Sequence, residues 1–208
     1  MDIKNLAVQI MALKTKAEMA DKQGNTKLRN DLLEQMRVLA DEAESSSKDP
    51  SRFVLVTSVY SMLNQMYFES DLKKATSYAF DGLYRASGLS EYPHSEEAMT
   101  MLLGSVMSLL NCLIKVYNEK QNSEYRRILC EIADMFKAVW DKLIALNPSS
   151  MAALRGQKII QILRQANMLG QSNRTFKDIK DNVIIATHMD YDNIGFQDMF
   201  TSIIKSYY

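Results

Sequence analysis

The sequence predicts an all-α protein: a single domain over 1–208, built as an irregular array of about four antiparallel helical hairpins with a C-terminal docking helix. Three observations carry this prediction. Only 7 glycines and 3 prolines occur in 208 residues, apolar residues recur at steps of three and four, and each proline falls between two predicted helix pairs. Because β-rich folds need many turns, the scarcity of turn residues favours long helices with few connections.

The first hairpin is predicted over about 1–47. Apolar residues form one helical stripe over 3–20 and a second over 28–43. Between the stripes, Gly24 fits the position just after a helix, where the backbone turns left-handed. The polar stretch "ESSSKDPSR" ends this hairpin, and its Asp49-Pro50 pair is typical of a helix start.

The second and third hairpins are predicted over about 50–88 and 94–147. The segment 53–68 is apolar on nearly every face, and its β-branched residues allow a strand over its first residues. The apolar pattern runs past the usual length of a strand and favours a helix. After Pro93, Ser95 is expected to cap the next helix, which has two acidic residues in its first turn.

The stretch "KLIALNPSSMAALRG", residues 142–156, joins the third hairpin to a fourth, predicted over about 149–186. Asn147-Pro148 repeats the pattern of Asp49-Pro50. The first helix of the fourth hairpin is predicted to start at Ser149 or Ser150 and to end at Leu169. Inside each pair the break is short, polar and free of proline. Helices joined so closely must lie antiparallel, and each pair leaves an apolar face for the next.

The C-terminal helix is predicted over about 193–207. Its apolar residues share one face: Phe196, Met199, Phe200, Ile203, Ile204 and Tyr207. A helix this apolar must dock on another surface, and capping of the last hairpin is the favoured arrangement. A homodimer contact and a membrane surface are the alternatives, although Asp198 and the single Lys205 weaken binding to an anionic membrane.

Several fragments resemble tetratricopeptide repeats. "KLIALNP" (142–148) is similar to the end of a repeat, where a small residue and a leucine precede Asn/Asp-Pro, and "AALRG" (152–156) to the start of the next. "AEMADKQGNTKLRNDLL" (17–33) and "YFESDLKKATSYAFDGL" (67–83) resemble the turn within a repeat. The 34-residue period of the family is absent, because the three prolines lie 43 and 55 residues apart. The resemblance implies a superhelical scaffold whose concave surface holds a partner segment, without catalysis.

Charge is balanced over the whole chain but uneven along it. Lys and Arg number 25, as do Asp and Glu, which argues against a strongly electrostatic nucleic-acid binder. Residues 1–119 hold 13 basic and 16 acidic residues, 120–180 hold 11 and 5, and 181–208 hold 1 and 4. The middle region therefore has an excess of 6 positive charges (11 − 5), enough for a basic patch.

The two cysteines, Cys112 and Cys130, lie inside helical patterns. Two isolated cysteines suit a reducing compartment, where a buried cysteine behaves as a small apolar residue, so we expect a cytoplasmic protein. A disulfide between neighbouring helices is the alternative. The first residues show no cationic flank before an apolar run, so no signal peptide is predicted.

Residues 98–114 carry no charge and form the candidate membrane span of the sequence. A span needs about 20 mostly apolar residues. This segment has 17 residues and holds Thr100, Ser105, Ser108 and Asn111. A central helix covered by its neighbours has the same composition, so we expect a buried helix and no membrane span.

The sequence shows no catalytic or cofactor-binding pattern, and we predict no enzyme activity, no cofactor and no metal. The G-x-S-x-G, C-x-x-C and H-E-x-x-H motifs and the glycine-rich phosphate loop are absent. His94 stands in a proline turn, and His188 lies with Asp190 and Asp192 in a stretch that favours a polar loop over a metal site. Gly104, alone in a helical pattern, is interpreted as a point of close helix packing.

The basic region supplies the candidate binding residues. They are Arg126, Arg127, Arg155, Lys158, Gln161 and Arg164. The first two open one helix, and the next three share a face of the following helical pattern by their spacing. A basic face suits an acidic peptide, a phosphate or the backbone of a nucleic acid. Solvated outer faces, whose long side chains cover apolar surface, are the alternative.

The sequence therefore predicts a non-catalytic, intracellular protein–protein interaction module, a scaffold that binds a partner segment in a helical groove. The alternative function is nucleic-acid or phosphate-ligand binding through 126–180. Fourteen methionines occur, and several, including Met62, Met66 and Met101, lie in the most apolar helices. They either fill the core or line an adaptable binding surface.

Overall fold

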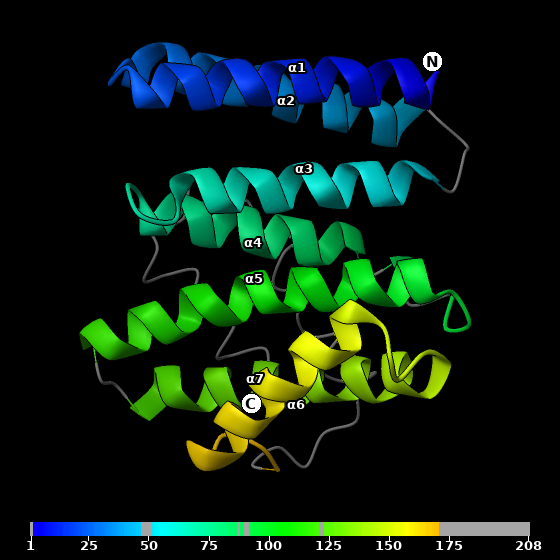
Figure 1. Cartoon of the computed structure of the whole chain (residues 1–208). Helices are drawn as coiled ribbons and strands as arrows, with labels where there is room; N and C mark the ends of the chain where they lie inside the picture. Colours follow the sequence, from blue (N-terminus) through cyan, green and yellow to red (C-terminus); the bar gives the residue numbers. More distant parts are fainter. Residues whose placement is uncertain (1, 47–50, 87, 90–91, 121–122, 171–208) are drawn as a thin grey trace.

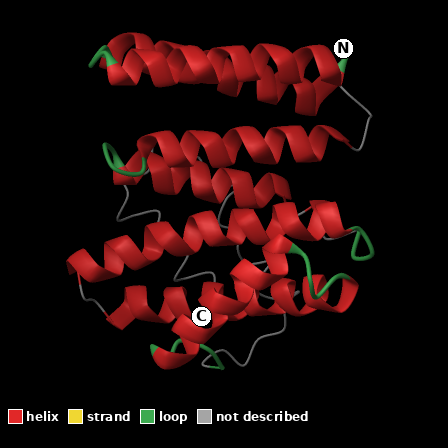
Figure 2. Cartoon of the chain, viewed as in Figure 1, coloured by secondary structure: helices red, strands yellow, loops and turns green. Residues whose placement is uncertain are grey.

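The structure is a computed structural model of the whole chain, and it describes residues 2–46, 51–86, 88–89, 92–120 and 123–170. Over these residues it contains seven α-helices and no strand (Figures 1 and 2). The helices are α1 (Ile3–Lys22), α2 (Thr26–Ser46), α3 (Ser51–Tyr67), α4 (Leu72–Ala86), α5 (Glu96–Lys120), α6 (Ser123–Leu146) and α7 (Met151–Gln165). The prediction of an all-α protein is confirmed, including the helix over 53–68.

Consecutive helices pack in pairs: α1 with α2, α3 with α4, and α5 with α6. The pairs follow one another through the molecule in chain order, since α3 packs on α1 and α2, and α5 packs on α3 and α4 (Figure 1). The last described helix, α7, packs on α6. Buried side chains of these helices form one apolar core, with Tyr60, Phe80 and Phe136 as its largest fully buried members.

Two predicted helix ends are confirmed. After α1 the chain turns at Gly24, whose φ of 71° lies in the left-handed region that favours glycine. The next residue donates its N–H to the Ala20 carbonyl at 2.9 Å, which closes the turn. At the start of α5, the Ser95 hydroxyl oxygen accepts the N–H of Ala98 at 3.2 Å, so Ser95 caps the helix as its sequence context indicates.

The start of α7 agrees with the prediction of Ser149 or Ser150, and the end of the helix differs from the prediction. Ser150 is the residue that caps α7, because its hydroxyl oxygen accepts the N–H of Ala153 at 3.1 Å. The helix ends at Gln165 rather than at Leu169. The physical reason is Asn167, whose φ of 53° is left-handed and stops the helix.

Close packing between helices occurs at Gly156 and not at Gly104. A Cβ on Gly156 would lie 2.9 Å from Nε1 of Trp140 on α6, closer than such atoms approach in proteins. The Trp140 indole donates to the Ala153 carbonyl at 2.9 Å, which holds the ring against α7. Gly104 is exposed and has no atom within 4 Å of a Cβ position, so its interpretation as a packing point is wrong.

Within the described part of the chain, α5 is the one helix long and apolar enough to cross a membrane, over Glu96–Asn118. Length and composition alone do not separate a membrane helix from a core helix. In this fold 56% of the apolar window is buried inside the protein, against α3, α4 and α6. This packing favours the predicted core helix.

Several predictions fall outside the described residues. These are the Asp49-Pro50 helix start, the second helix of the fourth hairpin, the C-terminal helix over 193–207, and the surroundings of His188. The four-hairpin, tetratricopeptide-like array therefore stays a prediction beyond the packing of α1 to α7.

Candidate functional site

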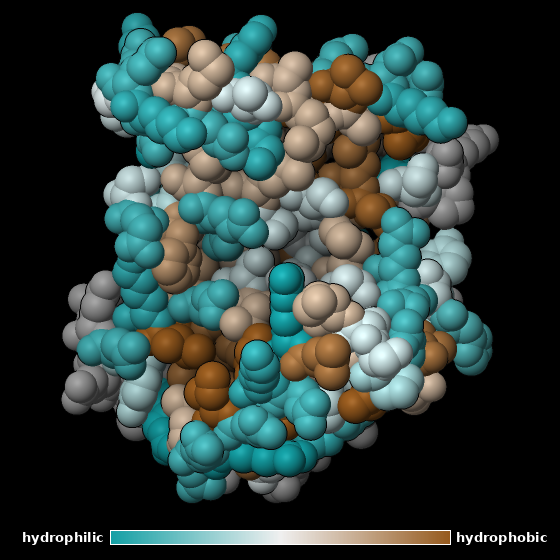
Figure 3. Space-filling view, viewed as in Figure 1, coloured by the Kyte–Doolittle hydropathy of each residue, from teal (hydrophilic) through white to brown (hydrophobic). Residues whose placement is uncertain are grey.

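An open groove of about 460 Å³ lies where α1, α3 and the start of α5 meet. We call it the α1–α3–α5 groove. Its apolar walls come from these three helices and from the loop before α5: Ile3, Ala7, Val54, Leu55, Leu89 and Ala98. Figure 3 shows apolar surface between α1 and α3 on the side of the N-terminus. The groove exists because α3 has apolar residues on nearly all faces, and its neighbours leave Val54 and Leu55 only half-buried.

The polar part of the α1–α3–α5 groove consists of hydroxyls and one carboxylate. Ser51, Ser58, Ser95 and Tyr92 supply the hydroxyls, and Glu97, in the first turn of α5, supplies the charge. None of the described residues that line the groove is basic. An apolar cleft with a few polar groups is the usual form of a binding site. The carboxylate at its edge favours a bound molecule that carries a positive charge.

The methionines of the apolar helices divide between core and surface. Met99 is fully buried in the core. Met62 and Met66 on α3, with Met101 and Met107 on α5, are only partly buried and pack against the core from its edge. Core filling therefore accounts for part of the set, and flexible thioether side chains remain at the surface of α3 and α5.

Five of the six predicted basic-face residues are exposed. They are Arg127 on α6 and Arg155, Lys158, Gln161 and Arg164 on α7. None of them lines the α1–α3–α5 groove. The predicted basic face and the groove are thus separate candidate sites.

The sixth predicted residue, Arg126, has a role in packing. Its guanidinium donates to the carbonyl oxygens of Ala166 and Asn167 at 3.4 and 3.3 Å. These carbonyls end α7, where the helix dipole favours a positive charge. Arg126 therefore joins the first turns of α6 to the end of α7.

A cluster of charged and aromatic side chains, the polar joint, connects α2 to α3 and α4. Its centre is Arg85 on α4, whose guanidinium lies 4.2 Å from the ring centroid of Tyr60. Arg85 pairs with Glu44 at 3.0 Å and with Asp81 at 3.3 Å. The Tyr60 hydroxyl donates to Asp41 at 2.8 Å. Each of these groups has partners within the fold, which indicates a structural joint between the first two helix pairs.

Burial changes the acid–base properties of the polar joint. Burial raises the pKa of Asp81 to about 6, against the opposing effect of the Arg85 charge. Burial also raises the pKa of Tyr60, so its hydroxyl keeps the proton that it donates to Asp41. The carboxyl of Asp81 therefore titrates at about pH 6.

Groups suited to catalysis are scattered or buried in the described structure. Cys112 and Cys130 are free and buried, with no disulfide between them, and burial raises the pKa of both thiols. A raised pKa disfavours the reactive thiolate. His94 is exposed in its turn. Among the described residues, no group of three His, Cys, Asp or Glu could hold a metal ion.

Sequence analysis did not find the α1–α3–α5 groove. A signal was present in α3, where Val54, Leu55 and Val56 follow one another in a helix that is apolar on nearly every side. Such a helix must leave some apolar residues uncovered unless neighbours surround it completely. Which of them stay uncovered depends on α1 and α5, and no local pattern contains that information.

No family model, curated protein or solved structure matches the chain.

Proposed function

We propose that the protein is a non-catalytic interaction module that binds a segment of a partner protein in the α1–α3–α5 groove. One observation carries the proposal. Three helices meet and leave apolar side chains, among them Val54 and Leu55, half-buried and open to solvent. Contiguous apolar surface of this kind marks sites that a partner covers.

The groove also defines the chemistry of the partner segment. Its volume of about 460 Å³ lies within the range of roughly 300–1,000 Å³ for ligand sites. Open grooves between helices suit an amphipathic helix whose apolar residues recur at steps of three and four. Glu97 at the edge favours a Lys or Arg beside those apolar residues.

We also propose an architecture and a cellular compartment for the module. We take the pairs α1–α2, α3–α4 and α5–α6 as the first three hairpins of a tetratricopeptide-like scaffold. In this scheme α7 opens a fourth hairpin, which the chain over 171–186 completes, and the helix over 193–207 docks on the array. A reducing compartment such as the cytoplasm suits the two free cysteines.

A second candidate function is nucleic-acid or phosphate-ligand binding through the basic region 126–180. The exposure of Arg155, Lys158 and Arg164 on one helix favours it. The groove is preferred because its apolar walls lack a covering element in the described structure, whereas long basic side chains are stable in water.

Affinity purification separates the two functions. The tagged full chain is captured from an extract of its source cells, with and without nuclease, as wild type and as two variants. Ala7→Arg places a long side chain in the half-buried groove wall and keeps helix propensity. Arg155→Glu with Lys158→Glu reverses the exposed basic face of α7.

We expect wild type and the α7 variant to retain the same protein partner after nuclease treatment, and Ala7→Arg to lose it. Circular dichroism checks that each variant keeps its helix content. If bound material instead disappears with nuclease or with the α7 variant, and Ala7→Arg retains it, the basic face is the site and the groove proposal is refuted.

A further inference from the structure

The first helix pair has apolar residues on the side turned away from the rest of the fold. Val8 and Met19 on α1 are 70% and 54% exposed, and Leu28 and Val38 on α2 are 45% and 41% exposed. On amphipathic helices that face water, such positions are normally polar. In Figure 1, α1 and α2 form one end of the molecule, and the described structure places no helix beyond them.

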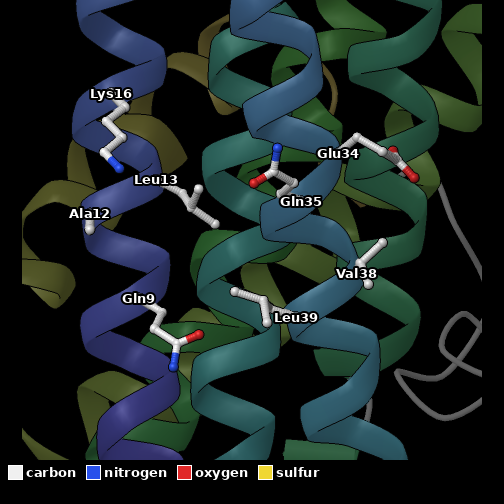
Figure 4. A pocket seen from close by; sticks show the side chains of 8 residues that line it. All are labelled: Gln9, Ala12, Leu13, Lys16, Glu34, Gln35, Val38 and Leu39. Atoms are coloured by element: carbon white, nitrogen blue, oxygen red, sulfur yellow. The ribbon is translucent and has the colours of Figure 1, made fainter.

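A second groove, of about 490 Å³, lies between α1 and α2 on this outward side (Figure 4). Its apolar lining is Ala12 and Leu13 from α1 and Val38 and Leu39 from α2. The exposed apolar residues extend it along both helices, from position 8 to 19 and from 28 to 38, or about 15 Å at 1.5 Å per residue. This outward face has the length of three helical turns, enough to hold another helix.

The two helices of this face carry opposite net charges. Four basic and two acidic residues give α1 a net charge of +2 (4 − 2), and three basic and five acidic residues give α2 a net charge of −2 (3 − 5). Lys16 and Glu34 line the groove from the two sides, and Lys16 and Asp31 are both exposed. Two of the acids counted on α2, Asp41 and Glu44, pair with Arg85 on α4 and do not belong to this face. The charges of Lys16 on α1 and of Asp31 and Glu34 on α2 remain, and they are complementary between two copies.

We propose that a second copy of this chain docks on the outward face, with α1 of each copy over α2 of the other. A two-fold axis parallel to the helices produces this arrangement, which is a four-helix bundle with one self-complementary interface. It sets Lys16 of each copy against the acidic residues on the outward side of α2 of the other copy, and it makes facing helices antiparallel. The other two-fold packing, α1 on α1, would bring like charges together.

The end position of α1 and α2 supports the same conclusion. Helical arrays need a polar outer face on their terminal units to remain soluble as monomers. The outward face of α1 and α2 exposes four large apolar residues among its polar ones, which favours a cover over it. The predicted C-terminal helix is a less suitable cover, because 193–207 has one acidic and one basic residue and complements neither helix. The described chain also ends at Gly170, beside Asp134 of α6, at the other end of the molecule.

The level at which facing residues meet follows from the antiparallel pairing of α1 and α2. Leu13 and Gln35 line the same part of the groove, so each step up α1 matches a step down α2. Rotation about an axis parallel to the helices keeps every residue at its height. Lys16 of one copy therefore comes within one residue, or about 1.5 Å, of the level of Asp31 of the other, and the two-fold repeats this pair.

Oligomeric state is the first test. The mass of the full chain is measured by light scattering after gel filtration, over a range of protein concentrations. We expect a dimer for wild type and a monomer for Val8→Glu with Val38→Glu, which places charge on both helices at exposed positions and keeps helix propensity. Ile162→Glu on α7, also at an exposed apolar position, is the matched control and stays dimeric. A monomeric wild type, or a dimer that survives the double change, overturns the proposal.

Charge exchange tests the arrangement of the helices. Lys16→Glu and Asp31→Lys each place like charges across the proposed interface and weaken the homodimer by roughly tenfold, since two pairs are lost. A mixture of the two single variants regains both pairs, so a heterodimer tighter than either homodimer is expected. If the mixture dimerises no better than its components, α1 does not lie over α2 of the other copy. If the wild-type chain is monomeric until 171–208 is removed, the cover is its own C-terminal segment.

Discussion

Single residues of the polar joint link stability to pH. Burial raises the pKa of Asp81 from 3.8 to about 6, so the folded state holds this proton more tightly than the unfolded state. The resulting stability is fully present below the unfolded pKa and is lost as the pH rises through about 6. From this group we expect the free energy of unfolding to fall by at most about 3 kcal/mol between pH 4 and pH 7.

Urea denaturation at pH 5.0 and pH 7.5 measures this effect, with Asp81→Asn as the comparison. The variant keeps the size and hydrogen-bonding capacity of the side chain but cannot ionise. We expect it to lose most of the stability difference between the two pH values. An unchanged difference would show that other groups cause it.

Two helical glycines are predicted to respond oppositely to alanine. Gly104→Ala meets no atom within 4 Å and replaces a poor helix former, so we expect a gain of about 0.5–1 kcal/mol in unfolding free energy. Gly156→Ala drives a methyl group into Trp140 and is expected to lose about 1–3 kcal/mol. Chemical denaturation of both variants and of the wild type measures these changes in unfolding free energy. Equal effects at the two sites would contradict the close approach of α7 to Trp140.

Sequence reasoning succeeds at residues whose role is local. Gly24 and Ser95 are predicted correctly because turn and cap geometry depends on a few neighbouring residues. Gly104 and Gly156 look alike in sequence, each a lone glycine in a helical pattern. The two differ in how closely another helix approaches them, and the apolar periodicity of the sequence contains no information on that distance.

At the scale of helices, Arg85 ties α4 to α2. It pairs with Glu44 on α2 and with Asp81 on its own helix, and its side chain is 16% exposed. Arg85→Ala would leave these carboxylates without their cation, and we expect a loss of about 2–4 kcal/mol in unfolding free energy.

Arg37→Ala is the control for this prediction. Arg37 pairs with Glu34 and Asp41, both on its own helix α2, and is 33% exposed. Pairs of this kind contribute less than about 1 kcal/mol. Guanidinium denaturation of both variants tests the contrast. A loss for Arg85→Ala no greater than that for Arg37→Ala would refute the role of Arg85 as a link between helices.

Helices are the level at which the sequence is most informative. Seven helices lie where stripes of apolar residues indicate them, because one buried face per helix leaves a clear period in the sequence. The end of α7 is the exception. Asn167 takes a left-handed conformation that glycine usually adopts, so the pattern through Leu169 suggested a longer helix.

At the scale of the whole molecule, the candidate sites arise where separate helices meet. The α1–α3–α5 groove combines residues from Ile3 to Ala98, and each looks like an ordinary core or helix-start residue in its own segment. These residues come together only because α1, α3 and α5 pack next to one another in the folded protein. The basic residues of α7 can be recognised in the sequence because they share one helix. Their spacing predicts a basic face but does not identify a ligand for it.

Photo-crosslinking from inside the groove tests the proposed function most directly. A photoreactive benzoylphenylalanine replaces Leu55 in the groove wall or, as a control, Lys158 on the exposed face of α7. The full chain is then irradiated in its source cells. We predict that Leu55 crosslinks to one partner protein, that Ala7→Arg abolishes this product, and that Lys158 gives none. Crosslinks from Lys158 to nucleic acid or protein, with none from Leu55, would contradict the groove as the binding site.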